Sequence, residues 1–218
     1  MLEERTVGGL HDFLITHVFP RFVRGGGCAI DLGAGSGALA VRLRSLGVQV
    51  QAIDLDKDGF RGEGPFVQID LNGPDFVTRL GEGEFDLVTA VEVIEHLESP
   101  IRFLRNVGCL LKPDGIAVLT TPNVDNAPAR VKFFLTGKLR MMDEQGEPTH
   151  IAPIFWDLLT RQYLPRAGLK IVEHHLYPPN GYHVTRPRYA WALRILARLL
   201  PGPALGGDTH VLVLQRQY

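Results

Sequence analysis

Apolar and polar residues follow two different periods along the chain, and the change from one period to the other predicts helices between strands. Apolar residues recur at helical spacing from Leu10 to Val23, where the glycines at 25–27 should end a helix. Further helices are predicted from Ala38 up to Gly47 and over 100–111, 156–167 and 189–200. Short apolar runs predict strands over 28–32, 48–55, 66–70, 85–90, 116–120, 169–176 and 210–215, with a turn at 112–115.

The order of these elements predicts the fold class. Strands that are separated by helices favour an α/β protein with a doubly wound, mainly parallel, seven-stranded sheet of Rossmann-like type and helices on both faces. We expect one domain over residues 1–218, because this length with 45% hydrophobic residues can bury one core. Sheets of this kind bind ligands outside the carboxyl ends of their strands.

Composition narrows the classes of partner and compartment. The chain has 23 Lys and Arg against 24 Asp and Glu, which argues against a nucleic acid partner. Cys28 and Cys109 lack metal-site spacing and are expected to be buried free thiols, as in a reducing compartment. We find no leader pattern and no apolar run near the roughly 20 residues that cross a bilayer, so we expect a cytoplasmic protein without a transmembrane segment.

One compact motif follows the first predicted strand. After Asp31, the chain places Gly33, Gly35 and Gly37 within five positions, directly before a predicted helix. Glycines at such a turn adopt positive φ and let a ligand approach the main chain closely. Asp31 would repel a phosphate group and attract a cation, so the motif favours a cationic ligand.

Acidic residues end several of the predicted strands. Asp31, Asp54, Asp70 and Glu92 should therefore meet at one edge of the sheet. Taken singly, each has an ordinary explanation, such as capping a loop or forming an Asx turn. Asp54 follows Asp31 at close to the offset of about 20 residues at which an acid meets a ribose diol in dinucleotide-binding folds. Four acids together favour a binding site.

These segments resemble the ordered motifs of class I S-adenosylmethionine-dependent methyltransferases. The resemblance covers about residues 10–176 and rests on the segments 31–37, 52–54, 69–71 and 85–88. It implies S-adenosylmethionine as the cofactor. The implied cofactor-binding residues are Asp31 at the amino end, Gly33, Ala34, Gly35 and Gly37 under the methionine portion, Asp54 at the ribose, Asp70 at the adenine amino group, Leu55 and Leu71 against the base, and Val91.

The segment 91–97 resembles ubiquinone-biosynthesis O-methyltransferases and small-RNA 2′-O-methyltransferases. That resemblance implies that Glu92, Glu95 and His96 can bind a divalent metal such as Mg, provided the segment is a helix that brings them to one face. Alternatively, the two acids are solvated and His96 only lies near the pocket. The small-RNA enzymes have a further histidine downstream, where this chain has His150. His96 and His150 are our candidates for a general base.

Two segments are expected to contact the acceptor. Residues 123–150, with the basic amphipathic stretch 129–142, occupy the place of the family's lid, and residues 178–208 form a second insertion. The basic stretch either binds an anionic acceptor, a lipid or another subunit, as in a homodimer, or is a surface helix whose apolar side packs on the sheet. The second insertion contains arginines among aromatic residues, at Arg186, Arg188, Tyr189, Trp191, Arg194 and Arg198, which either stack on a ring or flank a buried stripe.

Three functions remain in competition. The preferred one is methyl transfer to an oxygen of a small-molecule, glycan or lipid-linked acceptor. The second is an NAD-dependent oxidoreductase, because Gly33, Gly35 and Ala38 satisfy a loose dinucleotide fingerprint. Asp31, Asp70 and the lack of a Tyr-x-x-x-Lys pair argue against it. The third is a catalytically silent subunit that binds the cofactor.

Overall fold

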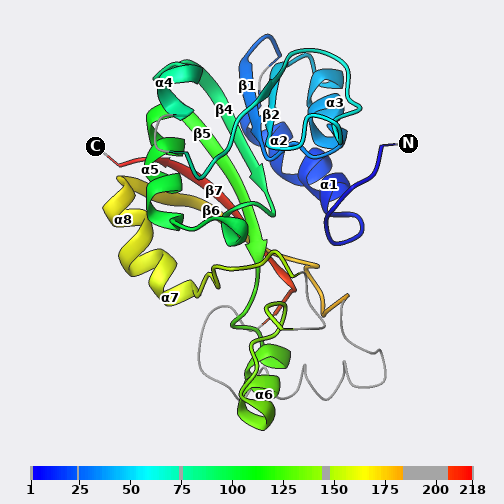
Figure 1. The fold of residues 1–218 in the computed structure, drawn as a ribbon, viewed down its shortest axis with the longest axis vertical. Helices are drawn as coiled ribbons and strands as arrows, with labels where there is room; N and C mark the ends of the chain where they lie inside the picture. Colours follow the sequence, from blue (N-terminus) through cyan, green and yellow to red (C-terminus); the bar gives the residue numbers. More distant parts are fainter. Residues whose placement is uncertain (1, 24, 74–75, 144–147, 184–205, 218) are drawn as a thin grey trace.

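The protein folds around a seven-stranded sheet (Figure 1). The structure is a computed structural model, and it describes residues 2–23, 25–73, 76–143, 148–183 and 206–217. The strands lie in the order β3-β2-β1-β4-β5-β7-β6. They are β1 (Cys28–Leu32), β2 (Gln49–Asp54), β3 (Phe66–Gln68), β4 (Phe85–Val91), β5 (Leu111–Pro122), β6 (Leu169–Tyr177) and β7 (Thr209–Arg216). The predicted fold class is confirmed.

Strand β1 lies at the centre of the parallel part of the sheet. It pairs in parallel with β2 on one side and with β4 on the other, so Asp31 lies level with Ala52 and Thr89. Strand β7 runs antiparallel to both β5 and β6. The strand order reverses between β1 and β4, and the carboxyl ends at this point form the crevice where such sheets bind ligands.

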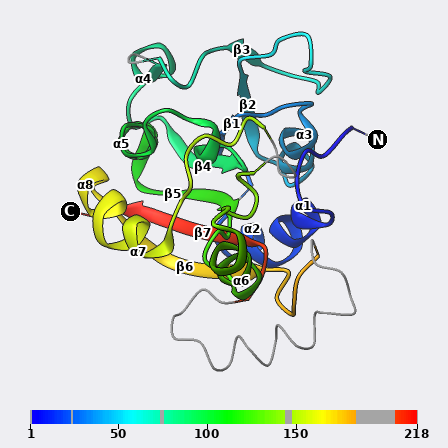
Figure 2. The same cartoon turned by 60° about the horizontal axis from the view of Figure 1, so that its bottom comes forward.

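Helices cover both faces of the sheet, as Figure 2 shows. One face carries α1 (Leu10–Phe13), the π-helical turn η1 (Leu14–Val18), α2 (Phe19–Phe22) and α3 (Ala38–Ser45). The other carries α4 (Phe76–Leu80), the 3₁₀ turn η2 (Ile94–His96), α5 (Pro100–Leu110), α7 (Trp156–Leu158), the π-helical turn η3 (Leu159–Tyr163) and α8 (Leu164–Ala167). Because side chains alternate along a strand, Val118 of β5 packs in the first layer and Ala117 and Leu119 pack in the second.

Helix α5 illustrates why these segments are helical. Pro100 occupies its first turn, where its missing N–H leaves no bond unmade. Phe103, Leu104 and Val107 then recur at helical spacing, and each is at most 1% exposed against the sheet. The predicted boundaries of the helices at 10–23, 100–111 and 156–167 agree with the observed ones to within a residue, although π-helical turns interrupt the first and the third.

Two local predictions were wrong. The turn expected at 112–115 is a bulge inside β5, because β4 pairs Phe85 with Leu111 but Leu87 with Ile116, which forces the intervening residues of β5 outward. The two cysteines are free, as expected, but Cys28 and Cys109 are only partly buried. The helix predicted at 189–200, together with its arginines and aromatic residues, lies outside the described residues. Among the described helices, none is long and apolar enough to span a membrane.

The described part of the segment expected to form a lid contains helix α6 (Ala127–Thr136), which projects from the body of the protein (Figure 1). Its first turn is buried, whereas Phe133, Phe134 and Leu135 are 53%, 86% and 71% exposed. The apolar residues in the second half of α6 therefore do not pack on the sheet, which contradicts one of the two alternatives for the basic stretch.

A buried ion pair attaches this segment to the start of β7. The side chain of Asp208 is fully buried, and its Oδ1 accepts a hydrogen bond of 2.8 Å from Nη1 of Arg140. Its Oδ2 accepts one of 2.6 Å from the backbone N–H of His183. Asn126, the N-cap of α6, donates to the carbonyl of Gly207 at 2.8 Å. These contacts join three segments that are distant in the sequence.

We predict that Arg140→Gln lowers the free energy of unfolding by about 3 kcal/mol, because it removes the cation of Arg140 from the buried carboxylate of Asp208. Denaturant titration followed by circular dichroism measures this change. Arg161→Gln is the matched control, since Arg161 pairs with Asp157 on the surface, where ion pairs contribute little. Equal stabilities of Arg140→Gln and the wild type would contradict a structural role for the pair.

Candidate functional site

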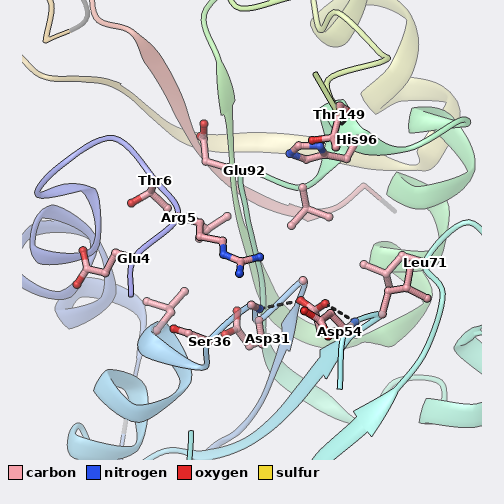
Figure 3. A pocket seen from close by; sticks show the side chains of 18 of the residues that line it. Glu4, Arg5, Thr6, Asp31, Ser36, Asp54, Leu71, Glu92, His96 and Thr149 are labelled. Carbon is pink, nitrogen blue, oxygen red and sulfur yellow. Dashed lines mark hydrogen bonds between the residues drawn. The ribbon is translucent and has the colours of Figure 1, made fainter. Parts of the chain in front are cut away.

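A cavity of about 1000 Å³ opens at the carboxyl ends of β1, β2 and β4 (Figure 3). Most of the residues proposed from the sequence line it, which brings together the glycine-rich loop, four strand-end acids and the two candidate bases. Those that line it are Asp31, Gly33, Ala34, Gly35, Asp54, Leu55, Asp70, Leu71, Val91, Glu92, His96 and His150. The expected convergence of four acids on one edge is therefore observed.

Asp31 is the most deeply buried of these acids, with 2% of its surface exposed. Its Oδ1 accepts a hydrogen bond of 2.7 Å from the hydroxyl of Thr89 on β4, and its Oδ2 has no hydrogen-bond partner among the described residues. Burial raises the pKa of Asp31 from its usual 3.8 to about 7, although the Thr89 hydrogen bond opposes the shift. A cation that reached Oδ2 would favour the ionised form.

The glycine-rich loop makes a tight turn beside Asp31. Gly33 has φ +72°, and a Cβ atom there would lie 2.5 Å from Cγ2 of Val93. Gly37 does not line the cavity but precedes α3, with φ +87° and no room for a Cβ beside Phe60. Both positions therefore require glycine, one for close packing below the cavity and one for the start of α3.

Asp54 has a role that the sequence did not suggest. Its Oδ2 accepts a hydrogen bond of 2.7 Å from the backbone N–H of Gly35, and its Oδ1 accepts one of 2.9 Å from that of Asp56. A carboxylate has further lone pairs, so these bonds leave capacity for a ligand hydroxyl. Asp54 thus joins the end of β2 to the glycine-rich loop on β1.

The third strand end supplies a polar and an apolar side to the cavity. Asp70 accepts a hydrogen bond of 2.8 Å at Oδ1 from the N–H of Asn72, which is the Asx turn that we had considered as its ordinary explanation. Leu55 and Leu71 both line the cavity, and Leu55 is 62% exposed. A flat apolar ring between them would remove such surface from water.

Glu92 adopts an uncommon backbone conformation. Its φ is +55°, a value that glycine favours, and its carboxyl accepts a hydrogen bond of 2.8 Å from the hydroxyl of Thr120. Burial raises the pKa of Glu92 to about 7, against the effect of that hydrogen bond. The condition that a helix brings Glu92, Glu95 and His96 to one face is not met, because Glu92 turns the chain away from β4 before a single 3₁₀ turn, η2, begins at Ile94.

As a result, a different set of side chains meets near the cavity. Ligand atoms of Glu95, His96 and His150 lie within 4.8 Å of one another, whereas Glu92 is outside this group. Glu95 is 1% exposed and does not line the cavity itself; its Oε2 accepts from Thr121 at 3.0 Å, and its Oε1 has no partner in the described part of the chain. Burial and then Glu92 raise the pKa of Glu95 well above its usual value.

Backbone carbonyls orient the two histidines. Nδ1 of His96 lies 3.1 Å from the carbonyl of Thr149, and Nδ1 of His150 lies 2.9 Å from that of Met141. The two rings meet edge to face with their centroids 4.7 Å apart. Because a carbonyl accepts, Nδ1 carries the proton in both neutral rings, which leaves each Nε2 able to accept a proton or bind a metal.

The N-terminal segment, residues 3–7, was missed as part of the site. It lines the cavity together with His11, and the hydroxyl of Ser36 in the glycine-rich loop donates a hydrogen bond of 2.6 Å to the carbonyl of Glu3. Glu4 forms an ion pair with Arg42 of α3. No periodicity marks this segment in the sequence, and only contacts with distant residues assign it to the site.

Comparison with known proteins supports the resemblance. A family model described as "Methyltransferase domain" matches residues 10–174. A ubiquinone biosynthesis O-methyltransferase of Xanthomonas campestris pv. campestris (strain B100) is 31% identical over 141 residues, which are 62% of this chain and 58% of that protein. The corresponding protein of Xanthomonas oryzae pv. oryzae (strain PXO99A) is 32% identical over the same shares. The chain therefore spans 58% of the length of these curated relatives.

Two solved structures share the fold. A SAM-dependent methyltransferase from Archaeoglobus fulgidus has a TM-score of 0.68 at 15% identity, with 94% of each chain covered. A Burkholderia thailandensis 1,6-didemethyltoxoflavin-N1-methyltransferase with bound 1,6-didemethyltoxoflavin and S-adenosylhomocysteine has a TM-score of 0.61 at 16% identity, with 95% of this chain and 78% of that chain covered. At these identities the likeness establishes the fold.

We predict that Asp31→Asn removes part of the pH dependence of folding. The pKa of Asp31 is raised in the folded state, so the unfolded chain loses this proton first as pH increases from about 4 to about 7. The free energy of unfolding of the wild type should therefore fall across this window, by on the order of 3 kcal/mol more than that of the variant. Denaturant titrations at several pH values measure the difference.

Asp86→Asn is the control for that experiment. Burial acts to raise the pKa of Asp86, but hydrogen bonds from Lys112 and from the N–H of Cys28 outweigh it and lower the pKa. The contribution of Asp86 to the free energy of unfolding is therefore lost only as pH falls below the usual range for Asp. Asp86→Asn should leave the change of that free energy between about pH 4 and about pH 7 as it is in the wild type. If the free energy of unfolding changes with pH equally in the wild type and in Asp31→Asn, the raised pKa of Asp31 is contradicted.

Proposed function

This chain belongs to the S-adenosylmethionine-dependent methyltransferase family, and on that basis we propose that it transfers a methyl group from S-adenosylmethionine to an oxygen of a small-molecule, glycan or lipid-linked acceptor. The observation that carries the proposal is the pairing of a buried carboxylate, Asp31, with a glycine-rich loop in a large cavity. The donor has an ammonium and a sulfonium, and both favour such an environment.

The charges around the cavity favour this donor over a nicotinamide dinucleotide. Its described lining contains seven carboxylate residues and a single arginine or lysine, Arg5. A pyrophosphate would meet net repulsion there, whereas a cationic donor is attracted. In the proposed arrangement Asp31 binds the donor ammonium and Asp54 accepts hydrogen bonds from the ribose hydroxyls. Asp70 binds the adenine amino group, and the ring lies between Leu55 and Leu71.

Methyl transfer requires that the acceptor oxygen lie close to the methyl group and that water be excluded from between them. The acceptor oxygen attacks the methyl carbon in line with the sulfur, the C–S bond breaks, and the sulfonium becomes a neutral thioether. The protein contributes orientation and exclusion of water. The hydroxyl proton moves to Nε2 of His96 or His150, since a histidine base works near neutral pH. An oxygen acceptor agrees with the O-methyltransferase names of the two Xanthomonas relatives.

The group formed by Glu95, His96 and His150 also fits a divalent cation. A carboxylate oxygen of the buried Glu95 lies within 4.8 Å of a ring nitrogen of each of the two imidazoles, and oxygen with nitrogen ligands suits Mg, Mn or Zn. When bound, such an ion would lower the pKa of the acceptor hydroxyl. Glu92, which the sequence placed in this set, would instead face the acceptor from the cavity wall.

Titration calorimetry tests the donor. We predict that the wild type binds S-adenosylhomocysteine and that Asp54→Ala weakens this binding by about 1–3 kcal/mol, the range for a lost charged hydrogen bond. An analogue without the ribose 2′-hydroxyl should bind the wild type more weakly than S-adenosylhomocysteine does. Asp54→Ala should bind the two ligands almost equally. Binding of NAD without any response to S-adenosylhomocysteine would overturn the proposed function.

The base is tested by kinetics. We predict that His150→Gln or His96→Gln lowers kcat by about 10²–10⁴-fold without changing the affinity for S-adenosylhomocysteine. His17→Gln, at an exposed histidine outside the cavity, is the matched control. Formation of S-adenosylhomocysteine from S-adenosylmethionine, with phenols, catechols and sugars as acceptors, provides the assay, and turnover of none of these acceptors would favour the silent subunit. Activity that survives a chelator would exclude the metal.

A further inference from the structure

Two residues other than glycine have a positive φ in the described part of the chain, and both line the cavity. One is Glu92, and the other is Met141, with φ +70°. Such a conformation is unfavourable for a residue with a Cβ atom, so the surrounding structure must hold it in place. Strained residues of this kind cluster at functional sites. The conformation of Met141 at the edge of the cavity therefore points to a role in the site.

The carbonyl of Met141 contacts one of the two candidate bases. It lies 2.9 Å from Nδ1 of His150 and accepts the proton that this nitrogen carries. A neutral imidazole has one such proton, and free histidine prefers to carry it on Nε2. The hydrogen bond reverses this preference and leaves Nε2 of His150 as the acceptor. Both roles considered for His150, as a general base and as a metal ligand, need an Nε2 without a proton.

A buried ion pair fixes the residue before Met141. The side chain of Arg140 is 9% exposed, and its Nη1 donates to Oδ1 of Asp208 at 2.8 Å. The backbone of Asp208 is held in turn, because its N–H donates to the carbonyl of Tyr177 at 2.7 Å and its carbonyl accepts from the N–H of Asn123 at 2.7 Å. Tyr177 ends β6 and Asn123 directly follows β5, so the ion pair attaches Arg140 to the sheet.

The chain is also fixed on the other side of His150. The N–H groups of Ile151 and Ala152 both donate to the carbonyl of Glu95, each at 2.9 Å. These bonds hold the imidazole next to η2, whereas the buried ion pair holds the carbonyl that it contacts next to β7. The hydrogen bond to Nδ1 therefore joins two parts of the chain that are each attached to the body of the protein.

We propose that Arg140 and Met141 are positioning residues for His150. The ion pair of Arg140 with Asp208 fixes the chain, and the positive φ of Met141 turns its carbonyl toward the imidazole. The hydrogen bond then selects the tautomer in which Nε2 accepts. The buried ion pair thus contributes to catalysis as well as to stability. The catalytic part rests on the proposed function, whereas the tautomer of His150 is a property of the protein alone.

Nuclear magnetic resonance tests the tautomer directly. Two-bond ¹H–¹⁵N correlation spectra in mildly alkaline buffer with a chelator distinguish the two neutral forms of a histidine ring, and the signals of His150 are those absent from His150→Gln. We predict that His150 of the wild type carries its proton on Nδ1. Met141→Val should move the proton to Nε2 in most molecules, because a β-branched residue does not tolerate a positive φ. Arg140→Gln should act in the same direction, because it releases the chain from Asp208.

Met141→Gly is the matched control. It also removes the side chain, but glycine adopts a positive φ freely, so the tautomer of His150 should stay as in the wild type. The ring of His96, whose Nδ1 lies against the carbonyl of Thr149, should keep its tautomer in every variant. A shift of equal size in Met141→Gly and Met141→Val would overturn the proposal, as would an unchanged tautomer in Met141→Val. A shift in Met141→Val without one in Arg140→Gln would reject the part assigned to the ion pair.

Catalysis is measured separately, with an acceptor that the wild type methylates. The kcat of Met141→Val should be about tenfold lower than that of Met141→Gly, the lower end of the effect of a lost partner of a functional histidine. Both variants should bind S-adenosylhomocysteine like the wild type, which also shows that they fold. Equal kcat values despite a shifted tautomer would overturn the catalytic role of the contact. If the wild type binds no S-adenosylhomocysteine, the proposed function fails, and the spectra still decide whether Met141 positions His150.

Discussion

The parallel pairing of β1 with β2 and with β4 is the constraint on which the site depends. These strands all end at one edge, and the strand order reverses between β1 and β4, so the loops that follow them diverge. Asp31 and Asp54 reach the same cavity because their strands are neighbours in register. The glycine-rich loop then turns directly beneath that cavity and is joined to Asp54 by the Gly35 amide.

The same arrangement concentrates negative charge where water is scarce. Burial raises the pKa of Asp31 and of Glu92 to about 7, and it raises that of Glu95 well above its usual value. Each ionised form is unfavourable in the absence of a cation. A donor with two positive centres would relieve part of this cost, so the raised pKa values and the proposed preference for a cationic ligand have one physical origin.

The predictions from the sequence succeeded where short-range patterns decide the structure. Strand ends and the glycines after Asp31 can be identified from residue type and spacing alone, and so most of the residues that line the cavity were predicted. The conformation after β4 was not. Glu92 has a positive φ, and the Thr120 hydroxyl on β5 bonds both its N–H and its carboxyl; since Thr120 is distant in sequence, no local pattern shows that the helix cannot begin there.

By itself, the sequence determined the order of helices and strands, the seven-stranded sheet and the acids at its edge, because burial imposes periods of two and 3.6 residues on apolar positions. Tertiary structure decided what lies against those acids. It added the N-terminal segment through Ser36 and Glu3, replaced Glu92 by His150 in the group around Glu95, and joined the segment after β5 to β7 through Arg140 and Asp208. Such contacts join residues far apart in the chain, so only the folded chain brings them together.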